Sequence, residues 1–288
     1  MLNDHPYYPN VLITCDDLAS EIDRNTYVVI EVDLDPDSYD QGHIPGALRW
    51  DWKSQLRNNV TSEALDKEAF EALMQSTGIS IDTPVVFYGD NNNWFACWAF
   101  WLMKLYGHEN VWILDGGPRK WFADGHPVSD QATSPRPPSE YRACSPDMSL
   151  KATTQDIFES FFNPKTHRLL DVRSAAEYRG NLAGPGPGLE PTCQIAGHIP
   201  TAINIPWNLN CNADGTFKSP EELRSLYRSF DIVPELSVIT YCAIGERASL
   251  SWFVLKHLLE YTVVMNYESS MSRWSCIPNA PIVQGDAA

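Results

Sequence analysis

The stretch Val238-Ile239-Thr240-Tyr241-Cys242-Ala243-Ile244-Gly245-Glu246-Arg247-Ala248 decides how this chain folds, because it joins a strand, a loop and a helix start. An apolar, β-branched run ends abruptly at Cys242, a loop containing Gly245 follows, and an apolar helical pattern extends from Leu250 to Leu259. A strand that runs through a loop into a helix N-terminus points successive backbone N–H groups inward, which favours a bound anion. The same field lowers the pKa of a cysteine. The stretch therefore predicts a thiolate held among backbone amides.

The composition of the chain limits the class of protein that surrounds this loop. The chain has 288 residues, of which 43 % are hydrophobic and 10 are tryptophan, so it can build one large or two medium folded domains. The formal net charge of −16 argues against a general nucleic-acid binder, which needs a basic footprint. The same charge means that an anionic substrate has to be drawn in by a local positive site.

Cysteine usage and the N-terminus bear on the cellular compartment. The seven cysteines are an odd number and none forms a Cys-x-x-Cys pair, which argues against a zinc ribbon or a disulfide framework and favours reduced thiols. The N-terminus lacks the basic and apolar regions of a secretory signal. The longest apolar stretch, Trp94 to Tyr106, is interrupted by Lys104 and is too short to cross a bilayer. We therefore expect a cytoplasmic protein with no membrane contact.

The two halves of the chain repeat each other. Val85-Val86-Phe87-Tyr88-Gly89 matches the start of the opening stretch, Val238 to Cys242, at an offset of 153 (238 − 85). Gly42-His43-Ile44-Pro45-Gly46-Ala47 matches Gly197-His198-Ile199-Pro200-Thr201-Ala202 at an offset of 155 (197 − 42). Because the repeats of a solenoid are far shorter, a period this long indicates a duplicated domain.

Each half has the same order of predicted elements, in which short apolar strands alternate with helices. This pattern indicates a mostly parallel sheet with helices on both faces. We therefore predict an α/β fold with two tandem domains, residues 1–130 and 149–288, joined by a proline-rich linker over residues 131–148. The first half has Gly89 where the second has Cys242, so the N-terminal domain is expected to be catalytically inactive.

Four conspicuous polar residues are expected to serve the scaffold. His43 and His198 occupy matching turns in both halves, including the half without the cysteine, so neither is expected to be catalytic. Asp171 and Arg173 form an Asp-x-Arg sequence at a strand end. We expect this pair to tie loops together and not to contact substrate.

Several motifs occur together in this chain in a fixed order. They are Gly-His-Ile-Pro-Gly-Ala in the first half, Asp-Val-Arg-Ser followed by Glu177-Tyr178, and a lone cysteine that opens a C-terminal loop. With the tandem domains, this set resembles the rhodanese family over essentially the whole chain. The loop Cys242-Ala243-Ile244-Gly245-Glu246-Arg247 is similar to the Cys-Arg-Ile-Gly-Glu-Arg loop of two-domain bacterial thiosulfate sulfurtransferases. The resemblance implies two tandem rhodanese-like domains, each a mostly parallel sheet flanked by helices.

The resemblance also implies a reaction and a site. A sulfane sulfur passes from thiosulfate or a related donor to a thiophilic acceptor, such as cyanide or a thiol, through a persulfide of Cys242. No metal and no organic cofactor are expected, and the expected partners are a small anionic sulfur donor and either a small acceptor or a protein that accepts sulfur. Nucleic acid and membranes are not expected to bind. The residues implied to bind substrate around Cys242 are Ala243, Ile244, Gly245, Glu246, Arg247, Ala248 and Arg179.

Two positions depart from the pattern of the family. Ala243 stands where the related loop has Arg, and Glu177 stands where the vertebrate-type and mercaptopyruvate enzymes use Arg. A lost charge-assisted hydrogen bond to a dianion costs roughly 1.5–3 kcal/mol. We therefore expect weaker binding of thiosulfate, or an altered preference among sulfur donors.

Three alternative functions stay open. The first is a 3-mercaptopyruvate sulfurtransferase, although Ile244 stands where those enzymes carry Ser. The second is a cysteine-loop phosphatase of the same fold, but its loop has one residue more between Cys and Arg than the segment from Cys242 to Arg247. The shorter ring leaves space for a single sulfur and not for a phosphate. The third is a sulfur-relay carrier that accepts persulfide from a partner protein.

Overall fold

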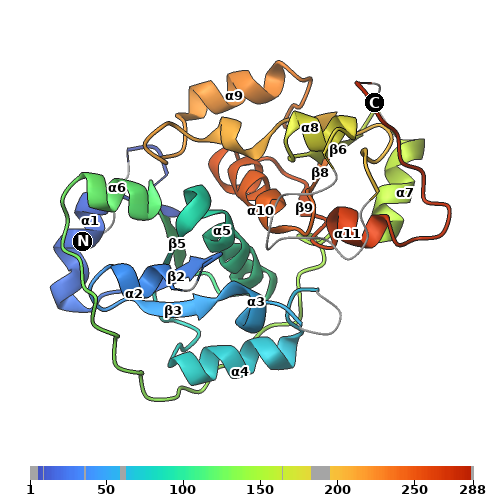
Figure 1. Cartoon of the computed structure of the whole chain (residues 1–288). Helices are drawn as coiled ribbons and strands as arrows, with labels where there is room; N and C mark the ends of the chain where they lie inside the picture. Colours follow the sequence, from blue (N-terminus) through green and yellow to red (C-terminus); the bar gives the residue numbers. More distant parts are fainter. Residues whose placement is uncertain are drawn as a thin grey trace. The chain divides into compact units, whose positions relative to one another are not determined.

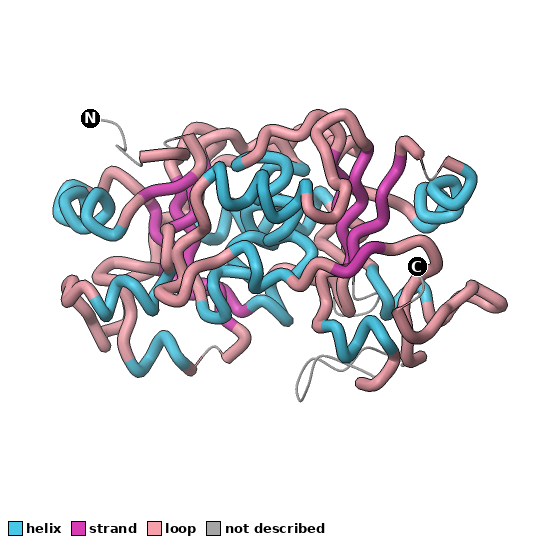
Figure 2. The backbone as a smooth tube through the Cα atoms, turned by 90° about the horizontal axis from the view of Figure 1, so that it is seen from above, coloured by secondary structure: helices cyan, strands magenta, loops and turns pink. Residues whose placement is uncertain are grey.

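The computed structural model describes residues 6–8, 10–35, 37–58, 63–163, 165–182 and 195–286. The chain divides into two compact units (Figure 1). The N-terminal unit comprises residues 1–147 and 211–217, and the C-terminal unit comprises residues 148–210 and 218–288. Each unit contains a parallel sheet with helices on both faces (Figure 2), which confirms the predicted tandem α/β fold.

The described part of the N-terminal unit forms a five-stranded sheet in the order β1-β5-β4-β2-β3, with all neighbours parallel. Its strands are β1 (Leu12–Ile13), β2 (Val28–Asp33), β3 (Leu48–Asp51), β4 (Val85–Tyr88) and β5 (Val111–Leu114). Its helices are α1 (Cys15–Glu21), α2 (Ser38–Gln41), α3 (Trp52–Gln55), α4 (Lys67–Thr77), α5 (Asp90–Leu105) and α6 (Gly117–Ala123). All residues of β2 and β4 are buried, as expected for central strands covered on both faces.

The described part of the C-terminal unit forms a four-stranded parallel sheet in the order β7-β6-β8-β9. Its strands are β6 (His167–Asp171), β7 (Ile203–Asn204), β8 (Ser237–Tyr241) and β9 (Val264–Asn266). Its helices are α7 (Thr154–Phe162), α8 (Ala175–Arg179), α9 (Pro220–Arg228), α10 (Glu246–Phe253) and α11 (Ser270–Trp274). A π-helical turn, Val254–Leu258, extends α10. The sheet packs on a core that includes Ile239, Tyr241, Tyr267 and Trp274.

The two sheets repeat each other in strand order and in register. The order β5-β4-β2-β3 of the first sheet corresponds to β9-β8-β6-β7 of the second. Val85 pairs with Val111, and Val238 pairs with Val264. Both residues of the second pair follow those of the first by 153 positions (238 − 85 and 264 − 111). The duplication predicted from the sequence is therefore confirmed in the backbone.

One segment of the second half belongs to the N-terminal unit. Residues 211–217 form a small hairpin closed by the antiparallel bridge between Cys211 and Phe217. The N–H of Phe217 donates to Oδ1 of Asp115 at 2.8 Å, and Arg119 donates to the carbonyl oxygen of Ala213 at 3.0 Å. The domain boundaries expected from the sequence do not include this pairing. It joins residues about a hundred positions apart, and a local sequence pattern does not indicate so distant a partner.

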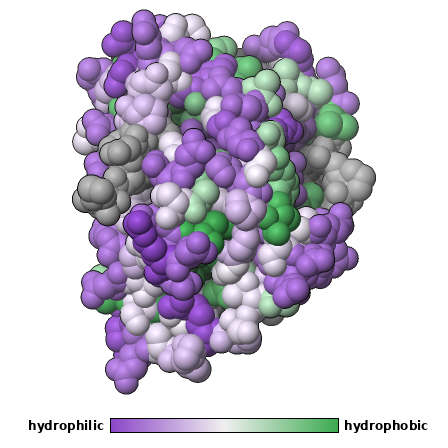
Figure 3. Space-filling model, turned by 90° about the vertical axis from the view of Figure 1, so that its left-hand side faces the viewer, coloured by the Kyte–Doolittle hydropathy of each residue, from purple (hydrophilic) through white to green (hydrophobic). Residues whose placement is uncertain are grey.

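Within the part of the chain that the structure describes, no helix is both long and apolar enough to cross a bilayer. The face of the molecule drawn in Figure 3 is mainly hydrophilic, with apolar residues in small groups. Exposed apolar side chains in scattered groups are normal for a folded protein.

Candidate active site

Cys242 lies at the carboxyl end of β8, directly after Tyr241, and its side chain is fully buried. In parallel α/β sheets this end of the strands is where ligands bind. The loop from Cys242 to Gly245 then leads into α10, which begins at Glu246. Gly245 precedes the helix with a φ of +106°, a conformation that favours glycine. The strand, the loop and the helix start are thus confirmed where the sequence predicted them.

The backbone of the loop turns toward the sulfur of Cys242. The N–H of Gly245 donates to Sγ at 3.0 Å, and this bond and one from the backbone of Ala248 lower the pKa of the thiol, as does the positive charge of Arg247. Burial raises the pKa more strongly, and the Glu246 carboxylate adds to the rise, so the net shift is upward. The lowered pKa predicted from the sequence is therefore wrong, because desolvation of the Cys242 thiol outweighs the effect of the backbone amides.

Residues at the start of α11 form hydrogen bonds with the backbone of the loop from Cys242 to Gly245, here called the cysteine loop. The Ser270 hydroxyl accepts the N–H of Cys242 at 3.0 Å and donates to the carbonyl oxygen of Tyr267 at 2.8 Å. The N–H groups of Met271 and Ser272 donate to the carbonyl oxygens of Cys242 and Ala243. These bonds fix the direction of the loop amides.

Sequence reasoning missed the role of Ser270. The matching residue of the first half is Gly117 (270 − 117 = 153), which has no hydroxyl. There the N–H of Gly89 donates instead to the side chain of Asn93 at 3.0 Å. The difference between serine and glycine at matching positions was the signal that could have revealed this role.

Arg247 is bound by a carboxylate of its own unit. Its two terminal nitrogens donate to the two carboxylate oxygens of Glu177, each at 3.0 Å. Both side chains are almost completely buried. Glu177 also accepts hydrogen bonds from the N–H and the hydroxyl of Ser174, with which it forms the capping box of α8. The bidentate pair is the strong form of a charge-assisted hydrogen bond.

The structure brings most of the predicted site residues together and separates one. Ala243, Ile244, Gly245, Glu246, Arg247 and Ala248 form the loop and the first turn of α10, and the five with side chains are buried. Arg179 instead has a half-exposed side chain and pairs with Asp286 at 2.5 Å. The contacts described for Arg179 thus lie on the surface of the unit.

The residues expected to serve the scaffold do so. The side chain of Arg173 pairs with that of Asp171 at 2.6 Å and donates to the carbonyl oxygen of Gly197 at 2.8 Å. His43 stacks on Tyr39 and contacts its carbonyl oxygen, and in the second half His198 stacks in the same way on Tyr178. Each of these four side chains thus makes contacts of the kind expected for a scaffold residue.

Comparison with known proteins decides the family. The model of the rhodanese-like domain matches residues 14–124 and again residues 154–276. The chain belongs to the rhodanese family. A protein of Haloferax volcanii named "Putative thiosulfate sulfurtransferase" is 42 % identical over 290 residues, covering 99 % of this chain and all of that protein. The "Sulfur carrier protein TtuD" of Thermus thermophilus is 42 % identical over 281 residues, covering 97 % of this chain and 98 % of that one.

Solved structures agree on the fold of this rhodanese. An anaerobic ergothioneine biosynthesis enzyme from Chlorobium limicola superimposes with a TM-score of 0.87 at 24 % identity. The match covers 96 % of this chain and 71 % of the other. At this level of identity the likeness concerns the fold alone.

The N-terminal rhodanese domain has an acidic cavity at the carboxyl ends of β2 and β4. The cavity has a volume of about 400 Å³, and Glu31, Asp33 and Asp90 line it together with Ser38. Burial, and next the neighbouring Glu31, raise the pKa of Asp33 to about 8. Burial and then the charge of Asp33 raise the pKa of Asp90 to about 7. This part of the domain carries carboxyl groups where the other domain has its thiol.

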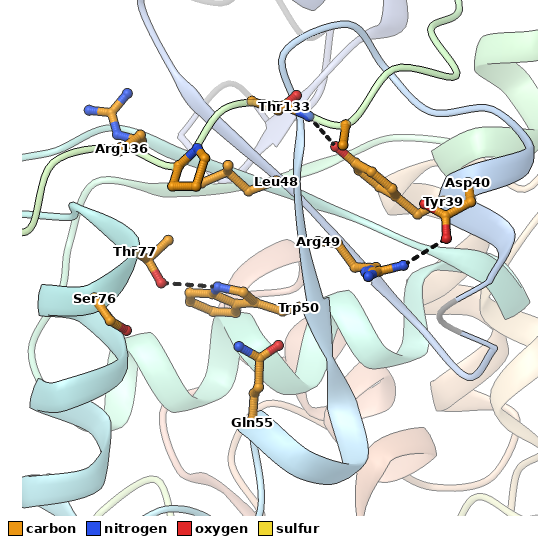
Figure 4. A pocket seen from close by; sticks show the side chains of 12 residues that line it. Tyr39, Asp40, Leu48, Arg49, Trp50, Gln55, Ser76, Thr77, Thr133 and Arg136 are labelled. Atoms are coloured by element: carbon orange, nitrogen blue, oxygen red, sulfur yellow. Dashed lines mark hydrogen bonds and ion pairs between the residues drawn. The ribbon is translucent and has the colours of Figure 1, made fainter.

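A second cavity of the N-terminal rhodanese domain, about 320 Å³ in volume, lies between β3, the end of α4 and the linker (Figure 4). Its polar side chains bind one another. Arg49 pairs with Asp40 at 3.1 Å, and the Trp50 indole donates to Thr77 at 3.2 Å. None of the described residues that line this cavity is a cysteine.

The state of the cysteines differs from the expectation at one position. Free thiols are present at Cys15, Cys97, Cys144, Cys211 and Cys242. Cys276 is disulfide-bonded, so the expectation of reduced thiols throughout is wrong for this residue.

Proposed function

We propose that this rhodanese is a sulfurtransferase that moves a sulfane sulfur from thiosulfate to a thiol or to cyanide through a persulfide on Cys242. The observation that carries the proposal is the Cys242 sulfur at a strand end, hydrogen-bonded by the N–H of Gly245 within a loop that opens a helix. Membership of the rhodanese family supports it. We further propose that Cys242 is the catalytic residue and that the loop residues Ala243 to Ala248 surround the transferred sulfur.

The reaction follows from these groups in two displacements. The Cys242 thiolate attacks the outer sulfur of thiosulfate, the S–S bond of the donor breaks, and sulfite leaves with the electron pair. The product is the persulfide Cys242–S–S⁻. The N–H of Gly245 donates to Sγ, and we expect the amides of the same loop to stabilise the terminal charge as an oxyanion hole does. A thiol then takes the outer sulfur as its own persulfide and returns Cys242 as the thiolate, while cyanide leaves as thiocyanate. Burial raises the pKa of the resting thiol, so sulfur loading should accelerate as the pH rises.

The N-terminal domain is proposed to be catalytically inactive. At the position of Cys242 it has Gly89, and the following segment is held by Asn93 instead of a serine hydroxyl. We also infer a cytoplasmic location, which is supported by the free thiols of five of the six described cysteines, Cys276 being the exception.

A sulfur-relay carrier is the second candidate function. It is supported by the identity of 42 % to a protein named as a sulfur carrier, and by the carboxylate that binds Arg247 beside the cysteine loop. A carrier of this kind would accept persulfide from a partner protein and would make no use of thiosulfate.

Mass spectrometry after incubation with thiosulfate tests the proposal. We expect a peptide containing Cys242 to gain the mass of one sulfur atom, and to lose it when cyanide or a thiol is added. No gain from thiosulfate, together with a gain from a persulfide donor, would favour the relay carrier. No gain from either donor would contradict sulfur transfer.

The substitution Ala243→Arg should strengthen the binding of thiosulfate. It introduces a guanidinium directly after Cys242, at the position where related loops carry Arg. Since a charge-assisted hydrogen bond contributes roughly 1.5–3 kcal/mol, we expect KM for thiosulfate to fall about 10- to 100-fold in the thiosulfate:cyanide assay. The exposed Ala72, in the N-terminal unit, offers the control Ala72→Arg, which should leave KM unchanged. Equal KM values for Ala243→Arg and the unaltered protein would contradict a shortage of cations at the loop.

A further inference from the structure

The contact between Glu177 and Arg247 changes the charge that a sulfur donor meets at the cysteine loop. The two groups form two parallel hydrogen bonds of 3.0 Å, and the backbone N–H and hydroxyl of Ser174 hold the same carboxylate. Burial works against ionisation of Glu177, but the hydrogen bond from Arg247 and its charge lower the pKa of the carboxyl. Glu177 therefore stays ionised at neutral pH and neutralises the guanidinium.

A second carboxylate also acts on Cys242. Glu246, the first residue of α10, is fully buried and raises the pKa of the thiol through its charge. Arg247 acts in the opposite direction on Cys242, but each of its two terminal nitrogens donates a hydrogen bond to Glu177. A dianion that approaches this loop therefore meets an arginine whose charge is already paired with that of a carboxylate.

We propose that Glu177 is a positioning residue that determines donor specificity by holding the guanidinium of Arg247 in a bidentate ion pair. The proposal rests on sulfur transfer by Cys242. The preferred donor class is then an alkyl hydropersulfide and not thiosulfate. The –S–SH group carries at most one negative charge, whereas thiosulfate is a dianion. The Cys242 thiolate attacks the outer sulfur of R–S–SH, the S–S bond of the donor breaks, and the thiolate R–S⁻ leaves with the electron pair. The proton stays on the new persulfide, Cys242–S–SH, so atoms and charge balance.

The test compares sulfur loading of Cys242 from thiosulfate and from glutathione hydropersulfide in the full chain. Loading rates are followed by mass spectrometry, and the ratio of the two rates is measured in the same sample. Because any unfolded fraction lowers both rates equally, the ratio reports donor specificity and not stability. Glu177→Gln keeps the size of the side chain and removes its charge. In this variant we expect the ratio of the loading rate from thiosulfate to the loading rate from the hydropersulfide to rise about 10- to 100-fold. The pH profile of loading should also shift to lower pH, since the Arg247 charge then acts on Cys242 without compensation.

The capping box of α9 offers a matched control. There Ser219 and Glu222 repeat the hydrogen bonds of Ser174 and Glu177, and Glu222 is exposed. Glu222→Gln makes the same chemical change in a helix cap away from the cysteine loop. It should change neither the donor ratio nor the pH profile.

The double variant Glu177→Gln/Arg247→Gln covers the case in which the single variant fails to fold, because it removes both charges of the buried pair together. The proposal predicts a donor ratio within about threefold of the unaltered protein. If the double variant loads sulfur from thiosulfate at least tenfold more slowly, and from the hydropersulfide at an unchanged rate, then Arg247 binds thiosulfate and the proposal is overturned. An unchanged ratio in a folded Glu177→Gln would overturn it as well, while sulfur transfer itself would stand. If Cys242 takes sulfur from neither donor, the proposed function fails and this inference fails with it.

Discussion

Replacement of Cys242 by serine should abolish sulfur transfer. In other enzymes, removal of the nucleophile lowers kcat by roughly six orders of magnitude. Serine nearly preserves the size of the side chain, but its hydroxyl cannot hold a sulfane sulfur as a persulfide. The Ser270 hydroxyl and the N–H of Met271 bind the backbone of residue 242, and a serine hydroxyl can accept the N–H of Gly245 in place of the sulfur. Cys242→Ser should therefore fold normally and be inactive in the thiosulfate:cyanide assay.

The other free thiols provide the control for this loss. Cys144 is exposed, so Cys144→Ser should retain full activity. Activity in Cys242→Ser within tenfold of the unaltered protein would show that another group carries the sulfur, and would contradict the assignment of Cys242.

The inactive half should not be rescued by a single substitution. A Cβ atom at Gly89 would lie 2.0 Å from the carbonyl oxygen of Val32, which no side chain tolerates. Gly89→Cys in the Cys242→Ser background is therefore expected to stay inactive. The absence of a cysteine in this half was visible in the sequence, but the steric reason is a contact between β2 and the end of β4 and needs the fold.

The sequence predicted the scaffold because the scaffold repeats. Val85 and Val238 stand in apolar strands at a fixed offset, and the equal register of their sheets follows from that match. The pairing of residues 211–217 with the N-terminal unit could not be predicted in this way. It depends on a hydrogen bond between Asp115 and Phe217, and a local sequence pattern carries no information about such a distant partner.

The sequence predicted which residue carries the thiol, but it did not predict the direction of the pKa shift of that thiol or the ion pair beside it. Local sequence identified Cys242, because a strand end, a glycine loop and a helix start lie within a few residues of it. The pKa of its thiol is raised by burial, which depends on the whole unit. Glu177 was recognised as a departure from related enzymes, but its contact with Arg247 joins residues 70 positions apart and could not be deduced from either segment alone.

The same substitution at two matching aspartates should change stability in opposite directions. Asp171 and Asp33 end the matching strands β6 and β2. Asp171→Asn removes the negative partner of Arg173, whose side chain is almost completely buried. Loss of one member of a buried ion pair costs about 3–5 kcal/mol, because the other charge remains buried without compensation. We expect the C-terminal unit to lose stability by this amount near neutral pH, as measured by urea unfolding followed through tryptophan fluorescence.

Asp33 shares its surroundings with the carboxyl groups of Glu31 and Asp90. Burial and the charge of Glu31 raise its pKa to about 8 in the folded state, against about 4 in the unfolded chain. The folded state therefore binds the proton more tightly, and its stability falls as the pH rises from about 4 to about 8. The N-terminal unit should therefore be less stable near pH 8 than near pH 4.

Asp33→Asn should remove this dependence on pH. An asparagine keeps an oxygen that can accept the N–H of Asp90, as Asp33 does at 2.6 Å, and its amide can donate to Glu31. Near pH 4 the variant and the unaltered protein should therefore be about equally stable, and near pH 8 the N-terminal unit should be more stable in the variant. Because the chain has two units, the transitions have to be resolved separately and not fitted as one two-state step. Destabilisation by Asp33→Asn at both pH values would contradict a protonated carboxyl in this cavity. If Asp171→Asn leaves the urea midpoint of the C-terminal unit unchanged, the ion pair between Asp171 and Arg173 does not contribute to stability as expected.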